Sequence, residues 1–101
     1  MASLASLGSY PAFTQKYSEE ELKMAAWRNA TFVSDGVSID CDGCHMVWHQ
    51  HGEYSEFGWQ VDHIIPKALG GPDIPSNVRA RHWRGNSSAG GVIGALLNKR
   101  R

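Results

Sequence analysis

The chain has 101 residues, enough for one small domain with a modest core, and its hydrophobic share of 42% excludes wholesale disorder. Its formal net charge of +0 gives no overall reason to expect a nucleic-acid ligand. The charges are unevenly spread, because no acidic residue follows Asp73. The basic residues in this last stretch are Arg79, Arg81, Arg84, Lys99, Arg100 and Arg101. They can bind phosphate locally or form a solvated surface with a disordered tail, and charge alone leaves both open.

Three features of the sequence concern its location. No apolar run approaches the ~20 residues of a membrane-spanning helix. The opening segment, MASLASLGSYPAF, lacks the charged start and the sustained apolar core of a secretory signal. The two Cys residues fit a reducing compartment better than a disulfide framework. We therefore expect a cytoplasmic protein without membrane contact.

The first predicted elements are a leader and a helix. Residues 1–16 are mostly small and show no hydrophobic period, so we expect a flexible leader followed by a single domain over 17–101. The segment YSEEELKMAAWRNA predicts a helix that Ser18 caps, and Glu21 completes a capping box with Ser18. The expected apolar face of this helix consists of Leu22, Ala25, Ala26 and Trp27.

The middle of the chain predicts short extended pieces. ATFVSDGVSID reads as two such pieces joined by a turn at Asp35-Gly36. The polar stretch that follows contains Cys41, Cys44 and three His residues.

The second half predicts a strand, a long loop, a strand and a helix. FGWQVDHII predicts a strand from Gly58 to His63, and NVRARHW predicts a second strand. Between them, PKALGGPDIPS is rich in Pro and Gly, which forbid a regular element. RGNSSAGG would start a helix that its Gly pair stops or kinks, and VIGALLNKR predicts a short C-terminal helix. These elements together predict an α+β fold.

The residues whose side chains could take part in catalysis or metal binding lie in this second half. Asp62 and His63 end the first strand, Asn77 lies fourteen residues after His63, and Asn86 lies nine residues after Asn77. This spacing, with the Gly-Gly loop, resembles the motif of the HNH endonuclease family over about 58–91. The third motif position is Asn rather than His, an HNN variant that is similar to the HNH domain of RNA-guided CRISPR nucleases more than to that of the colicins.

The resemblance implies a fold and a set of roles. The fold would be a ββα-metal (His-Me) finger, two strands and a helix around one divalent cation, with an added N-terminal helix and a short C-terminal helix. His63 would be the general base that activates water, and Asp62 and Asn86 would be the metal ligands. Asn77 would be the structural residue that pins the loop and orients His63.

The side-chain chemistry agrees with these roles. An unperturbed imidazole is mostly a free base at neutral pH and can take a proton from water. Carboxylate and amide oxygens suit Mg²⁺ or Mn²⁺ best, with Ni²⁺ or Zn²⁺ as alternatives, and such a cation stabilises charge on the phosphate and the leaving oxygen. Because adjacent strand residues point to opposite faces, Asp62 and His63 need a bend at His63 to address one phosphate.

Each of these residues also has an ordinary structural explanation. Asp62 and Asn86 are common as caps, His63 fits a half-buried core, and Asn77 fits a turn. Only their joint spacing favours the nuclease. The chain also departs from the family where Ala89, rather than Lys, precedes Gly90.

Cys41 and Cys44 form half of a zinc knuckle. Many HNH proteins carry a second Cys pair, which would fall near His82 and Gly85 in this chain. A structural Zn²⁺ would therefore need His ligands, and the alternative is a reduced pair in a tight turn. The candidate His ligands are His45, His49, His51 and His82. The residues expected to pack in the core rather than to stack on bases are Trp48, Trp59 and Trp83.

The leading hypothesis is thus a metal-dependent endonuclease acting on DNA with low sequence specificity. Arg79, Arg81 and Arg84 would contact phosphate. A second copy of the chain, or a larger phage or host protein, would be its protein partner, and a lone domain of this size suits a phage or prophage role. The alternative is a non-catalytic, zinc-dependent module that binds nucleic acid or protein and keeps the finger as scaffold.

Overall fold

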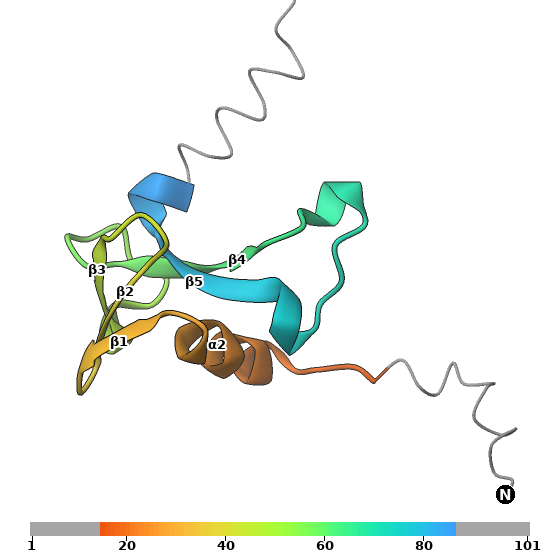
Figure 1. Ribbon diagram of the computed structural model, residues 1–101, viewed down its shortest axis with the longest axis horizontal. Coiled ribbons are helices and arrows are strands. Elements are labelled where there is room, and N and C mark those ends of the chain that lie inside the picture. Colours follow the sequence, from red (N-terminus) through yellow and green to blue (C-terminus); the bar gives the residue numbers. More distant parts are fainter. Residues whose placement is uncertain (1–14, 87–101) are drawn as a thin grey trace, which may run out of the picture.

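The computed structural model of the protein describes residues 15–86. The leader expected at 1–16 lies almost entirely outside the described residues, as do the end of the RGNSSAGG segment and the helix expected in VIGALLNKR. The described chain forms helix α2, a three-stranded antiparallel sheet and a two-stranded antiparallel sheet, and its last residues, 83–86, are helical. The predicted α+β class is therefore confirmed. In Figure 1, α2 lies along the two-stranded sheet, with the three-stranded sheet at one end.

Helix α2, Glu19–Arg28, begins at the predicted capping box. The Glu21 backbone N–H donates to Ser18 Oγ at 3.0 Å, and the Ser18 N–H donates to the Glu21 carboxylate at 2.8 Å. At the other end, the Asn29 side-chain amide donates to the backbone oxygens of Pro75 and Val78, at 2.9 and 2.8 Å. These bonds attach the end of α2 to the start of the last strand.

The three-stranded sheet has the order β1–β2–β3 and consists of Thr31–Ser34, Val37–Ile39 and His45–Val47. The predicted turn at Asp35-Gly36 joins the first two strands, and Gly36 has the positive φ of +72° that such a turn requires. Strand β3 is not predicted by the sequence. It is three residues long with only Met46 buried, so its hydrophobic pattern is too short to detect, and pairing with β2 supplies its stability.

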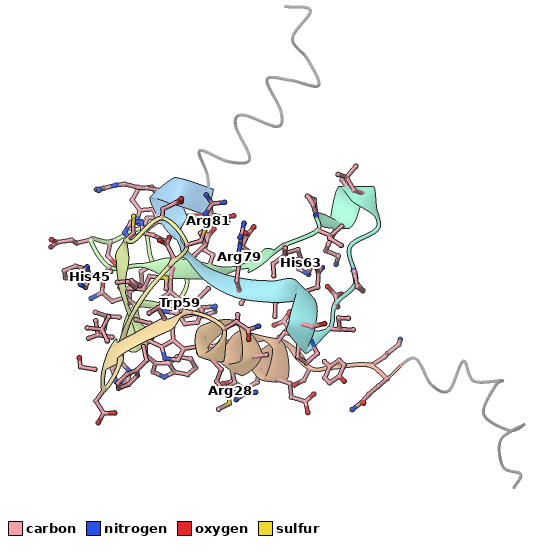
Figure 2. The ribbon with its side chains drawn as sticks, in the orientation of Figure 1. Arg28, His45, Trp59, His63, Arg79 and Arg81 are labelled. Carbon is pink, nitrogen blue, oxygen red and sulfur yellow. The ribbon has the colours of Figure 1, made fainter. Side chains whose placement is uncertain are left out.

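The two-stranded sheet is an antiparallel hairpin of β4, Trp59–His63, and β5, Val78–His82. Both strands are where the sequence predicts them. Successive side chains of each strand point to opposite faces of the hairpin. The residues on the α2 side include Trp59, Val61, Val78 and Ala80. Arg79 and Arg81 extend from the opposite face, as Figure 2 shows.

The core is centred on Trp59, which is 0% exposed. Its ring lies 4.9 Å from that of Trp27 and 5.7 Å from that of Trp48, and its indole N–H donates to the backbone oxygen of Val47. Trp83 lies outside this cluster, so its predicted core position is wrong. It follows the end of β5 and packs edge-on against Tyr54, with its indole N–H bonded to the oxygen of Ser55 at 2.7 Å.

The loop between β4 and β5 contains two short 3₁₀ helices, Lys67–Leu69 and Pro75–Asn77, where the sequence indicates no regular element. The backbone geometry of the loop explains why glycine occupies positions 70 and 71. Gly70 ends the first 3₁₀ helix with a φ of +90°, and a Cβ on Gly71 would lie 1.6 Å from the backbone oxygen of Ile65. The loop therefore folds back closely on the residues that follow β4.

Candidate active site

Asp62 and His63 lie at the loop end of the hairpin, on opposite faces. His63 lines a cleft beneath α2, whereas Asp62 bonds to Arg79 on the far face. The bend expected at His63 is not found. The ladder stays regular through the His63–Val78 pair, and Ile64 N–H continues it by donating to the Asn77 oxygen at 2.9 Å.

Asn77 closes the loop from its end. It is 5% exposed, and its Oδ1 accepts the Ile65 N–H at 2.9 Å. Its Nδ2 donates to the backbone oxygens of Ile65 and Pro72, at 3.2 and 3.0 Å. One amide thus holds the residues just after β4 and those near the end of the loop. This contact set joins the two sides of the loop, as expected of a residue that pins it.

His63 has a partner that sequence reasoning missed. Its Nε2 lies 2.6 Å from Asp73 Oδ1, and Lys67 Nζ lies 3.4 Å from Asp73 Oδ2. The hydrogen bond from His63 lowers the pKa of Asp73, with a smaller contribution from Lys67. Asp73 lies ten residues from His63 inside an irregular loop, so no periodicity in the sequence points to the pair.

The cleft beside His63 has a volume of about 310 Å³. Helix α2 forms one wall, and His51 and the β4–β5 loop form others. Burial lowers the pKa of His51, so this ring is a neutral group in the wall. The lining residues are Glu19, Leu22, Lys23, His51, Val61, His63, Lys67 and Asp73.

The opposite face of the hairpin carries the two expected metal ligands. Asp62 Oδ2 accepts from Arg79 Nε at 2.9 Å, and Asn86 Nδ2 donates to Gln60 Oε1 at 2.7 Å. Gln60 and Asp62 are alternate residues of β4, so they share a face and stand about 7 Å apart along the strand. The fold thus brings Asn86 to the face of Asp62 from the helical segment 83–86. Figure 1 shows this helix on the side of the hairpin away from α2.

The groups on this face include oxygen atoms of the kind that a hard divalent cation prefers, and also two guanidinium groups near Asp62. Among residues 15–86, neither Asp62 Oδ1 nor Asn86 Oδ1 accepts a hydrogen bond, whereas Asp62 Oδ2 accepts from Arg79 and lies 3.9 Å from Arg81 Nη1. One carboxylate oxygen and one amide oxygen suit Mg²⁺ or Mn²⁺, with water and phosphate completing the shell. Within the described range, no three His, Cys, Asp or Glu side chains form a group able to hold a metal by themselves.

The three arginines expected to contact DNA differ in their surroundings. Arg81 is 13% exposed at its side chain, and its Nη2 donates to Asp42 at 2.8 Å, a bond that raises the pKa of Arg81. It is therefore committed to a contact within the protein, unlike a free phosphate ligand. Arg79 is more exposed but pairs with Asp62, and Arg84 lies over the Trp83 ring at 5.2 Å.

The Cys41–Cys44 turn is organised by Asp40. Asp40 is 5% exposed, and its Oδ1 accepts the N–H groups of Asp42 and Cys44, both at 2.9 Å. Its Oδ2 accepts the His82 N–H at 3.0 Å, so the carboxylate joins the turn to β5. Both cysteines are free thiols, and burial, followed by the nearby charge of Asp40, raises the pKa of Cys44.

His82, one of the candidate zinc ligands, has both ring nitrogens engaged in hydrogen bonds. His82 Nδ1 accepts the Arg84 N–H at 3.1 Å, which leaves Nε2 as the protonated nitrogen that bonds the Glu56 oxygen at 2.7 Å. The ring therefore has no lone pair left for a metal.

Comparison of the chain with protein-family models, with curated proteins and with solved structures finds no match. Among residues 15–86, no helix is long and apolar enough to cross a membrane. The geometry of the hairpin, its loop and the side chains around them is therefore the basis for the function proposed below.

Proposed function

We propose that the protein is a metal-dependent endonuclease of the HNH type that hydrolyses DNA phosphodiester bonds. The observation that carries the proposal is the Asn77 side chain, whose three hydrogen bonds close the loop directly behind His63. The spacing of the motif residues does not by itself require Asn77 to be buried or to make these bonds, so they are independent support for the proposal. The hairpin and the start of the following helix match the order of elements that such a site needs.

His63 acts as the general base in this proposal. Its side chain is 20% exposed and borders the cleft, so water can reach the ring. A neutral imidazole takes a proton from the attacking water, and such a step typically contributes about 10²–10⁴-fold to a rate.

Asp62 and Asn86 would hold the divalent cation. The cation, when bound, supplies positive charge that stabilises the phosphate and the leaving 3′ oxygen. Arg79 and Arg81 lie 2.9 and 3.9 Å from Asp62 Oδ2, so the cation would bind at Oδ1 and would compete with these two positive groups. As a positive group beside the site, Arg79 also favours the approach of phosphate.

The opposite placement of Asp62 and His63 is compatible with the chemistry. In an in-line displacement, the attacking and leaving oxygens lie on opposite sides of the phosphorus. A phosphate at the end of the hairpin would meet the imidazole on one side and the oxygen ligands on the other. In this proposal, a regular strand lets both groups address one phosphate, without the bend that the sequence predicts.

The test is cleavage of supercoiled plasmid DNA by the purified protein with Mg²⁺, Mn²⁺, Ni²⁺, Zn²⁺ or EDTA. We expect metal-dependent nicking or linearisation that falls at least about 100-fold in His63→Ala. His49→Ala is the matched control, because His49 is exposed and lies away from the cleft. Absence of cleavage with every metal, or equal cleavage by wild type and His63→Ala, would contradict the proposal.

A non-catalytic module that binds nucleic acid is the second candidate. The observation in its favour is that Asp62 and His63 each have a partner within the protein, as purely structural groups do. It predicts DNA binding that is the same in the wild type and His63→Ala, with no cleavage by either. A gel-shift titration beside the plasmid assay separates the two candidates.

A further inference from the structure

We infer that Asp73 is a positioning residue for His63, holding the ring with Nε2 protonated and Nδ1 open to water. This inference rests on the proposed function, since it assigns the nitrogen through which His63 acts. Asp73 lies outside the motif spacing that identifies the other residues of the site.

The contact itself determines the tautomer. Asp73 is ionised at neutral pH, because the bond from His63 lowers its pKa, and an ionised carboxylate only accepts hydrogen bonds. At 2.6 Å from Asp73 Oδ1, His63 Nε2 must therefore carry the proton when the ring is neutral. The lone pair then lies on Nδ1, which has no hydrogen-bond partner among residues 15–86.

The loop places Asp73 by means of Asn77. Asn77 Nδ2 donates to the oxygen of Pro72, the residue before Asp73, and also to the oxygen of Ile65, two residues after His63. Gly71 N–H donates to the Pro66 oxygen at 2.9 Å, which draws the two arms of the loop together. Asn77 thus sets the separation of His63 and Asp73 without contacting either side chain.

No other charged group takes the place of Asp73 in the cleft. The charged or titratable groups that line it are Glu19 and Lys23 from α2, His51 from the segment before β4, and Lys67 from the loop. Within the described chain, Asp73 is the charged residue that bonds the His63 ring, through Oδ1. Lys67 Nζ donates to the other carboxylate oxygen of Asp73, Oδ2. Lys67 therefore acts on the ring through the carboxylate.

Because the His63–Asp73 pair is partly exposed, removing Asp73 can test its effect on the His63 ring without a large loss of stability. Asp73 is 48% exposed at its side chain, and solvent-exposed ion pairs contribute little to folding. Removing this carboxylate is therefore expected to lower the melting temperature by at most about 8 °C, with the protein still folded at the temperature of the assay. A change in the ring of His63 in that variant would report positioning rather than loss of structure.

The experiment compares wild type, Asp73→Ala and Asp73→Glu, with Asp35→Ala as a control that removes an exposed charge from the β1–β2 turn. Long-range ¹H–¹⁵N spectra of His63, recorded where the ring is neutral, should show one Nε2–H tautomer with a protected Nε2 proton in the wild type. In Asp73→Ala, that proton should exchange with water, and both ¹⁵N shifts should move toward those of a solvated histidine. Plasmid cleavage should show kcat lowered by about 10–100-fold with KM within about twofold, and Asp73→Glu should recover part of the loss.

The outcomes distinguish this inference from the function on which it rests. Cleavage by the wild type with unchanged kcat in Asp73→Ala, or an unchanged His63 spectrum in that variant, would overturn the role of Asp73 alone. Absence of cleavage by the wild type would overturn the proposed function, and the role of Asp73 with it.

Discussion

The two ends of the β4–β5 hairpin each depend on an aspartate, but in different surroundings. At the Trp59–His82 end, Asp40 is buried and accepts three backbone N–H groups. At the His63 end, Asp73 is half exposed and bonds two side chains, His63 and Lys67.

The contrast indicates which end is architectural and which is suited to chemistry. Backbone donors cannot leave Asp40 without unfolding the turn, so its contacts define the structure. Side-chain partners in an open cleft can exchange with water or substrate at little cost. The Asp40 end therefore joins the Cys41–Cys44 turn to β5, and the Asp73 end is the one at which we propose catalysis.

Replacing Asp40 should have the largest effect on stability. Asp40→Ala leaves three backbone N–H groups without their acceptor, and we expect a loss of about 3 kcal/mol in the free energy of unfolding. Urea denaturation followed by Trp fluorescence measures it, with Asp35→Ala as a control expected to change stability by less than about 0.5 kcal/mol. Equal stability of the two variants would contradict the architectural role of Asp40.

Replacing Asn77 should have an intermediate effect on stability and a strong effect on function. Asn77→Ala removes three side-chain hydrogen bonds, for an expected loss of about 2 kcal/mol. Because the loop then no longer holds Asp73 against His63, plasmid cleavage should fall by at least about 10-fold while the folded fraction remains high. Asn77→Asp keeps an acceptor for Ile65 N–H but turns a buried carboxylate oxygen toward the carbonyl oxygens of Ile65 and Pro72, so it should destabilise the protein at least as much as Asn77→Ala. Full activity in Asn77→Ala would contradict the claim that loop closure by Asn77 positions the residues of the site.

Replacing both cysteines should have the smallest effect. The double variant Cys41→Ser, Cys44→Ser retains the Asp40 contacts that form the turn, so we expect a change in stability below about 0.5 kcal/mol. A strong chelator should likewise leave the urea midpoint of the wild type unchanged. One zinc per chain by elemental analysis, lost in the double variant together with several kcal/mol of stability, would show that a metal and not Asp40 organises this end.

The helix and the hairpin strands were predictable because their causes are local. Ser18 and Glu21 lie within one helical turn, and the capping box forms as the sequence suggests. Trp59, Val61 and His63 alternate with polar residues over the length of a strand. By contrast, β3 is too short to show a pattern, and Trp83 packs on Tyr54 because β5 ends one residue before it.

By itself the sequence determined helix α2, the turn between β1 and β2, the two strands of the β4–β5 hairpin, and the spacing of His63, Asn77 and Asn86. Only the tertiary structure decided the partners of the charged side chains. Asp40 meets His82 across 42 residues, and Asp73 meets His63 through a closed loop, so neither contact leaves a periodic trace in the chain. The physical reason is that a periodicity records which face a residue occupies, whereas a hydrogen bond depends on what folding brings opposite that face.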